Sequence, residues 1–200
     1  MRTDKEDPKL KRLVNLFFEA GTLRKIARSH RQTLLTDDLS DNIASHSFRA
    51  TLISYFLAKQ EKVDPYKVVI MALFHDFEEA RSGDQNWVHK RYLTVDESAI
   101  IKDQVKDIVE DDELYQIAQE YEARKTVEAK LAKDADYLDQ ILLLKEYTQQ
   151  GNKEADSWLV DNQQAKRLYS ESAKKLAKEI INSEVDDWWL SLWTADRKKS

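Results

Sequence analysis

A histidine pair and a few carboxylates are the side chains of this sequence best suited to chemistry. His75 is followed directly by Asp76 at the end of the most hydrophobic segment of the chain, and His46 lies 29 residues upstream. Burying an imidazole and a carboxylate together costs several kcal/mol unless something compensates. Because both groups are metal ligands, a bound divalent cation is one compensation. Hydrogen bonds to a carbonyl and a helix cap are the simpler alternative.

Two further acidic residues extend this set. Glu79 follows His75 by four residues, which on a continuous helix places both side chains on one face. Asp136 lies among inward-facing leucines in the segment KDADYLDQILLL, and Asp134 and Asp139 are alternatives that spacing does not separate. Two imidazoles and two carboxylates could hold a cation and leave positions open for water or substrate. Glu78, about 100° from Glu79 on a helix, is expected to be solvated or salt-bridged.

Helices must position these residues, and apolar residues recur at three- and four-residue intervals along most of the chain. Asp64 and Pro65 are a typical N-cap and first helical residue, and Gly83 is a suitable end for the same helix. His46 opens the preceding helix, so two antiparallel helices could face each other. Residues 28–42 are predicted to be a loop or a broken helix. The expected helices cover residues 10–20, 43–61, 65–83, 95–109, 112–121, 127–147, 155–182 and 185–193.

Composition agrees with an all-α fold. The 200 residues are 42% hydrophobic and 34% charged, with only three glycines and two prolines, and strand-rich folds need many more turn residues than this. We therefore expect one helical domain over residues 1–200. Two of its helices carry apolar stripes typical of packing on a core: Leu10, Leu13, Val14 and Phe17 in the first, and Phe48, Leu52, Ile53, Phe56 and Leu57 in the second.

The composition also excludes several classes of protein and site. With no cysteine, the chain has no disulfides, thiolate metal sites or cysteine nucleophiles. It has no apolar run of about 20 residues and a polar N-terminus, so we expect a cytoplasmic protein that does not span a membrane. The net charge of −5 argues against extended contact with nucleic acid.

The order His46, His75-Asp76, Asp136 resembles the HD-domain metal-dependent phosphohydrolases. More narrowly, FHDFEEARSGD and KDADYLDQILLLKEY resemble the 5′-deoxynucleotidase branch, whose motifs are H-D-x-x-E-x-x-x-G-D and K-x-A-D-x-L-D. The resemblance covers about residues 10–176. It implies an HD-domain helical bundle, with the metal-site core at about 10–150 and C-terminal helices at about 155–193 that pack on this core or on a dimer partner.

The resemblance also implies roles for individual residues. Glu79 would activate or orient the attacking water or take part in proton transfer, and Asp84 would contact the sugar of a nucleotide. Arg28 would grip the phosphate, with Arg31 as the alternative. Four residues would hold one divalent cation: His46, His75, Asp76 and Asp136.

The function implied by the resemblance is metal-dependent hydrolysis of a (deoxy)nucleoside 5′-monophosphate to nucleoside and phosphate. The cation could be Co²⁺, Mn²⁺, Fe²⁺, Ni²⁺ or Zn²⁺, with Mg²⁺ as a further candidate. A homodimer is implied as well, to which Trp188, Trp189 and Trp193 could contribute. Another phosphoester substrate, or a catalytically silent HD fold used as a binding module, is the alternative.

Two departures from the family pattern concern the substrate. Ser45 stands where the family commonly has Glu before the first histidine, and the aromatic residue expected shortly after the phosphate arginine is absent. His30 could fill part of that aromatic role or be an ordinary loop residue.

Overall fold

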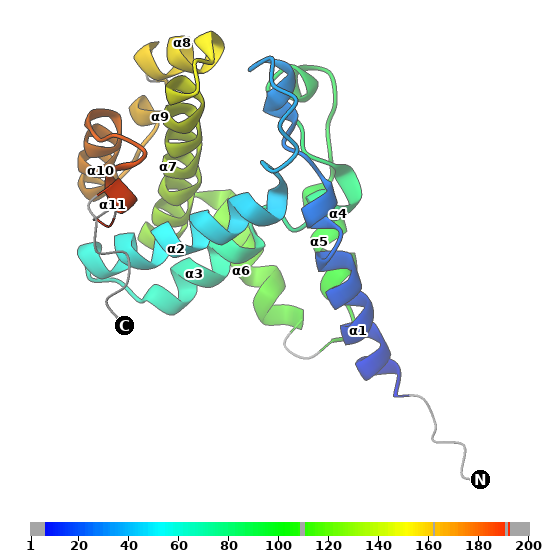
Figure 1. Ribbon diagram of the computed structural model, residues 1–200. Coiled ribbons are helices and arrows are strands. Elements are labelled where there is room, and N and C mark those ends of the chain that lie inside the picture. Colours follow the sequence, from blue (N-terminus) through cyan, green and yellow to red (C-terminus); the bar gives the residue numbers. More distant parts are fainter. Residues whose placement is uncertain (1–6, 109–110, 162, 191, 193–200) are drawn as a thin grey trace, which may run out of the picture.

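The computed structural model describes residues 7–108, 111–161, 163–190 and 192, and these form an all-α fold, as the composition predicts (Figure 1). Within this part of the chain, extended pairing is limited to one isolated bridge between Ala27 and Asn42. Three short 3₁₀ helices accompany the α-helices: η1 (Leu23–Lys25), η2 (Ser29–Gln32) and η3 (His89–Arg91). The α-helices are α1 (Pro8–Ala20), α2 (Ile43–Glu61), α3 (Pro65–Phe74), α4 (Glu79–Ser82), α5 (Glu97–Val105), α6 (Asp111–Ala123), α7 (Val127–Gln149), α8 (Lys153–Asp161), α9 (Gln163–Lys166), α10 (Glu171–Asn182) and α11 (Asp187–Leu190).

The long helix α7 is the centre of the larger hydrophobic core. Helices α2 and α3 pack on it, α2 lying across it in Figure 1, and α6, α8 and α10 contact it as well. Fully buried apolar side chains such as Leu57, Met71 and Leu138 fill the space between these helices. Burial of such side chains stabilises the fold by roughly 1.5–3 kcal/mol each.

A second, smaller hydrophobic core joins α1 and η1 to the segment around α5. Leu16, Leu23 and Val105 belong to it, and so do Ile43 at the start of α2 and Phe77 just after α3. The residues around His46 and His75 therefore lie where the two cores meet. None of the described helices has the length and apolar character that a bilayer crossing requires.

Local signals explain where the main helices begin. The side chain of Asn42 accepts a hydrogen bond from the Ser45 amide at the start of α2, and Asp64 does the same for Tyr66 before α3, which has proline at its first position as predicted. Thr126 caps α7 in the same way. These caps satisfy amides that have no partner within the helix.

Four predicted helices differ from the structure. The last of them, expected over 185–193, is the four-residue α11, Asp187–Leu190, within the described residues. The helix expected over 65–83 is interrupted: α3 ends at Phe74, four residues form turns, and α4 runs from Glu79 to Ser82. The stretch 155–182 is three helices, α8 to α10, rather than one. The helix expected over 95–109 is shorter, Glu97–Val105, and Val109 lies outside the described residues.

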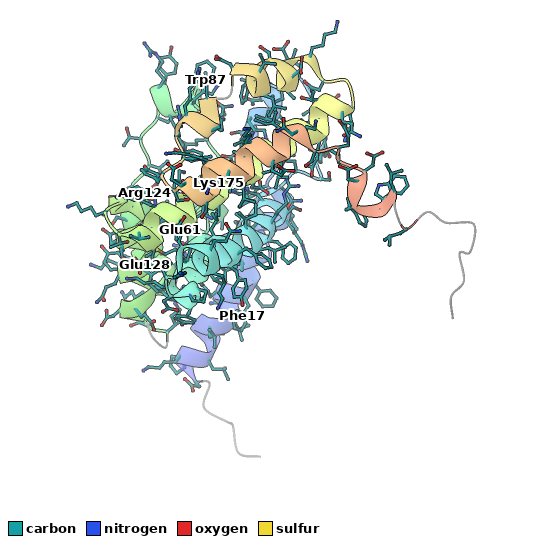
Figure 2. The ribbon with its side chains drawn as sticks, turned by 90° about the vertical axis from the view of Figure 1, so that its left-hand side faces the viewer. Phe17, Glu61, Trp87, Arg124, Glu128 and Lys175 are labelled. Carbon is teal, nitrogen blue, oxygen red and sulfur yellow. The ribbon has the colours of Figure 1, made fainter. Side chains whose placement is uncertain are left out.

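Part of each predicted apolar stripe on α1 and α2 faces outward rather than into a core. On α1, Phe17 is 63% exposed, and Figure 2 shows it at the edge of the molecule. On α2, Phe48 is 73%, Leu52 51% and Phe56 55% exposed. Of the C-terminal tryptophans, Trp188 is largely exposed, and Trp193 lies outside the described residues.

Candidate functional site

Three separate elements bring four potential metal-ligating atoms to one point. His46 comes from the first turns of α2, Asp136 from α7, and His75 with Asp76 from the turn that follows α3. His46 Nε2 lies 3.0 Å from His75 Nε2, 3.4 Å from Asp76 Oδ2 and 3.3 Å from Asp136 Oδ1. His75 Nε2 lies 3.2 Å from Asp76 Oδ2 and 3.9 Å from Asp136 Oδ1.

Four of these five separations fit a common cation, and the fifth, 3.9 Å between His75 Nε2 and Asp136 Oδ1, requires a wider angle between those two ligands. Two ligand atoms that are each about 2.1 Å from one ion lie about 3.0–3.4 Å apart at octahedral or tetrahedral angles. A cation bound between them would neutralise the two carboxylates and use the ring nitrogen atoms as ligands. The two histidines and Asp136 alone already form a compact set of three ligand atoms. The donor set therefore fits a divalent metal ion with mixed nitrogen and oxygen ligands.

The outer nitrogen atom of each imidazole is held by a hydrogen bond. His75 Nδ1 lies 2.7 Å from the Ala72 carbonyl oxygen, which can only accept, so Nδ1 carries the proton and Nε2 keeps its lone pair. His46 Nδ1 lies 2.6 Å from Asp139 Oδ2. Such partners fix the ring orientation and the tautomer of a metal-ligating histidine.

The interruption after α3 changes how Glu79 relates to its neighbours. Across the break, the Glu79 amide donates to the Asp76 carbonyl and the Ala80 amide to the Phe77 carbonyl, which is the three-residue repeat of a 3₁₀ turn. Residues three apart eclipse one another in this geometry. Glu79 is therefore aligned with Asp76, and the predicted alignment of Glu79 with His75 on a continuous helix is wrong.

Both glutamates after the His-Asp pair are buried, so the expectation that Glu78 is solvated is wrong as well. Burial, together with the charge of Asp76, raises the pKa of Glu78 to about 9. Burial and the nearby Asp76 and Asp84 carboxylates raise the pKa of Glu79 to about 10. Within the described residues, one oxygen atom of each, Oε2, has no hydrogen-bond partner. Each group thus favours the protonated form at neutral pH while no cation is bound.

Arg28 places a buried guanidinium beside the same carboxylates. Its Nη2 lies 3.4 Å from Gln140 Oε1 and its Nη1 3.6 Å from Asp139 Oδ2. Burial favours the neutral form, but the charges of Asp136, Asp76, Asp139 and Asp84 outweigh it, and the pKa of Arg28 is raised. Within the described part of the chain, Nε and Nη1 have no hydrogen-bond partner. Such unpaired donors on a charged guanidinium suit an anion such as a phosphate.

Asp84 and Asn86 fasten the backbone next to Arg28. Asp84 Oδ2 accepts hydrogen bonds from the Ser29 amide at 2.5 Å and the Ser29 hydroxyl at 3.0 Å. Asn86 Nδ2 donates to the Ser29 carbonyl at 3.0 Å. The buried Asn86 also caps η3 through its side-chain oxygen, which accepts from the Val88 and His89 amides. Nothing in the sequence marks Asn86, because its partner lies 57 residues away.

Comparison with known proteins identifies the family. The family model described as HD domain matches residues 20–181. The chain belongs to the HD domain family. It is similar to two curated proteins named 5′-deoxynucleotidase HDDC2: 29% identical over 126 residues to the one from Dictyostelium discoideum, and 28% over 143 residues to the one from Bos taurus. These matches cover 56% and 66% of this chain, and each spans just under two thirds, 66%, of the relative.

Solved structures share the fold of this HD domain. A predicted metal-dependent phosphohydrolase from Magnetospirillum magnetotacticum has a TM-score of 0.66 at 24% identity, covering 87% of this chain and 91% of that one. The HD phosphohydrolase DatZ of cyanophage S-2L, bound to dA and one catalytic Zn²⁺ ion, has a TM-score of 0.53 at 20% identity, covering 83% and 96%.

The HD domain's geometry also separates the three aspartates of α7. Asp136 alone directs an oxygen atom toward both Nε2 atoms. Asp134 accepts hydrogen bonds from the Tyr169 and Ser170 amides at 2.7 and 2.8 Å, and so fixes the start of α10. Asp139 lies behind His46, on the Nδ1 side.

The two remaining candidates beside Arg28 lie on η2. His30 is buried and paired with Asp41 at 2.7 Å, which is the ordinary role of a loop histidine. Arg31 is partly buried, three residues beyond Arg28. Of Arg28 and Arg31, only Arg28 has a described contact with α7, through Asp139 and Gln140.

Proposed function

We propose that this HD domain is a metal-dependent phosphohydrolase that removes phosphate from a nucleoside 5′-monophosphate, with deoxynucleotides preferred. One observation carries the proposal: four ligand atoms converge beside a buried guanidinium with unpaired donors. A cation and an arginine side by side suit a phosphate group, whose transfer needs positioning and charge stabilisation above all. The naming of two relatives as 5′-deoxynucleotidases and the dA bound by DatZ support a nucleotide as substrate.

His46, His75, Asp76 and Asp136 would hold one divalent cation in this proposal. Two imidazoles and two carboxylates suit Zn²⁺, Co²⁺, Mn²⁺, Fe²⁺ or Ni²⁺, with Mg²⁺ as a further candidate, and the zinc of DatZ supports the first. When bound, the cation supplies charge neutralisation and a coordinated water of lowered pKa.

The surrounding residues would bind the substrate and move protons. Arg28 would donate to the phosphate through one of its unpaired nitrogen atoms, with Arg31 as the alternative. Glu79 is buried and aligned with Asp76. It would hold or release a proton at Oε2 while the phosphoryl group is transferred to water. Asp84 would contact the sugar through Oδ1, because Oδ2 already accepts from Ser29.

We also infer that two copies associate through the exposed apolar face of α1 and α2. This face is defined by Phe17, Phe48, Leu52 and Phe56, and the side chain of each is more than half exposed. Phe48, Leu52 and Phe56 lie four residues apart and so share one face of α2, and exposed apolar surface of this kind marks interaction sites. Light scattering of the wild type and of Phe48→Asp checks the inference: a dimer that becomes a monomer supports it, and a wild-type monomer contradicts it.

The absence of cysteine suits a cytoplasmic location, where disulfides are rare.

Phosphate release from a panel of deoxy- and ribonucleoside 5′-monophosphates tests the function. The protein is stripped with chelator and reloaded separately with Co²⁺, Mn²⁺, Mg²⁺ and Zn²⁺. Metal-restored release that favours the deoxy substrates is the expected result. Release from other phosphoesters alone would replace the nucleotide, and metal binding without any release would indicate a binding module.

A further inference from the structure

Three basic groups surround the carboxylate of Asp139, which is only 2% exposed. His46 Nδ1 lies 2.6 Å from Oδ2, and Arg49 Nε lies 2.5 Å from Oδ1. Arg28 Nη1 approaches Oδ2 at 3.6 Å. One buried carboxylate thus touches a candidate metal ligand and the candidate phosphate arginine together.

The register of two helices creates this arrangement. Asp136 and Asp139 lie three residues apart on α7 and share one face, and His46 and Arg49 do the same on α2. His46 therefore lies between the two carboxylates: Asp136 Oδ1 faces its Nε2 at 3.3 Å, and Asp139 Oδ2 faces its Nδ1 at 2.6 Å. Neither flipping nor tilting of the ring would keep both contacts.

Arg49 is itself fixed at two points. Its Nε donates to Asp139 and its Nη1 to Glu146 Oε1 at 2.5 Å, two turns further along α7. A guanidinium that bridges two carboxylates on one helix has little rotational freedom. It also compensates the buried charge of Asp139, which would otherwise be costly.

We propose that Asp139 is a positioning residue that orients the His46 ring toward the cation and steadies Arg28 for the phosphate, and that Arg49 keeps Asp139 in place. The cation half of this proposal stands on the geometry of the donor set, and the phosphate half rests on the proposed function. A carboxylate shared in this way couples the two halves of the site without touching the reacting atoms.

The principal test is Asp139→Asn, which keeps the size of the side chain and removes its charge. Titration calorimetry of the stripped protein with Zn²⁺ or Co²⁺ should show metal affinity falling about 10- to 100-fold. At saturating metal, KM for the 5′-monophosphate should rise several-fold while kcat changes less. Metal affinity within twofold of wild type, in a variant with wild-type circular dichroism, would overturn the proposal.

Asp134→Asn is the matched control, since it removes another buried carboxylate from the same helix. Asp134 fixes Tyr169 and Ser170 and makes no contact with the site. This variant should lower the melting temperature and leave metal affinity unchanged. Equal losses of affinity in both variants would show that Asp139 acts only through general stability.

Arg49→Met keeps the proposal testable if Asp139→Asn does not fold. Arg49 is partly exposed and touches neither ligand atoms nor Arg28, so its loss should weaken metal binding less than Asp139→Asn does, by several-fold. Unchanged metal affinity and KM in this variant would contradict the role of Arg49. Because metal binding is measured without substrate, a wild type that binds metal but releases no phosphate would refute the proposed function alone.

Discussion

The two halves of the candidate site are built from different kinds of structure. The ligand atoms lie on or directly after packed helices: His46 on α2, Asp136 on α7, and His75 with Asp76 in the turn that follows α3. Arg28 and Asp84 lie on irregular segments beside η2 and after α4, and they are tied to each other through Ser29.

The groups that would bind the cation therefore have a fixed geometry, whereas the groups that would bind the substrate lie on structure that can vary. Groups fixed on packed helices keep their geometry without a ligand, whereas loops vary in sequence and position and commonly set specificity. We therefore expect loss of a metal ligand in the helical half to abolish function, and changes in the loop half to alter substrate affinity.

The largest effect is expected from His75→Ala, which removes a ligand atom from the centre of the set. Metal content measured by plasma mass spectrometry and phosphate release should both fall to background. His89→Ala, which changes a histidine of η3, is the control and should retain both. Stoichiometric metal in His75→Ala would show that the helical half is not the cation site.

Glu79→Gln should retain the metal and lose most of the turnover. Removing a group that transfers protons typically costs 10²- to 10⁴-fold in rate. Steady-state kinetics on metal-loaded protein measure this effect. The neighbouring Glu78→Gln is the matched control and should keep kcat within a few-fold; normal turnover by Glu79→Gln would remove Glu79 from the chemistry.

Arg28→Ala should act on substrate affinity while metal affinity stays near that of the wild type. The loss of charged hydrogen bonds to phosphate should raise KM about tenfold to a hundredfold. Arg31→Ala is the comparison and should change KM little. If only Arg31→Ala raises KM, the phosphate contact belongs to Arg31.

Asn86→Ala should give a smaller change, because Asn86 supports the loop from behind. Its loss frees the Ser29 carbonyl but leaves the two bonds from Ser29 to Asp84. We expect KM to rise a few-fold and calorimetric metal affinity to stay constant. A fall in metal affinity instead would mean that the two halves are not separable.

The smallest effect is expected at Glu78, in the turn after α3, and concerns how the stability of the fold depends on pH. Burial raises the pKa of Glu78 to about 9, above its ordinary value of 4.5, so folding favours its protonated form. The contribution of the protonated Glu78 carboxyl to the free energy of unfolding is complete below about pH 4.5 and is lost as the pH rises toward 9. In metal-free protein, Glu78→Gln should therefore raise the melting temperature by a few degrees at pH 8 and by less at pH 5. Equal shifts at both pH values would contradict a buried, protonated Glu78.

The sequence predicts the helical half of the site better than the loop half. Helical periodicity places His46 and the His75-Asp76 pair on or beside helices that must pack together, and the order of these residues identifies the family. Spacing does not separate Asp134, Asp136 and Asp139, because all three lie on buried parts of α7. Only the packing of α2 and α10 against α7 gives each its separate partner.

Two structural features leave no local signal in the sequence. The break after Phe74 occurs without glycine or proline, at the end of a continuous apolar run, so periodicity predicts a helix through it. The stripes on α1 and α2 show that a face is apolar but not what covers it, and Phe48 and Phe56 are in fact exposed.

Backbone hydrogen bonds join the two ends of the loop that follows Arg28. The Arg28 amide donates to the Asp41 carbonyl at 3.0 Å and the Ile43 amide to the Ile26 carbonyl at 3.1 Å, so both ends of residues 28–41 are fastened together. Leu35 and Leu39, farther along this loop, are 77% and 64% exposed. Lengthening a loop whose ends are already joined costs little free energy. Residues 35–40 are therefore a place where insertions can enlarge the surface of this loop while the arginine stays where it is.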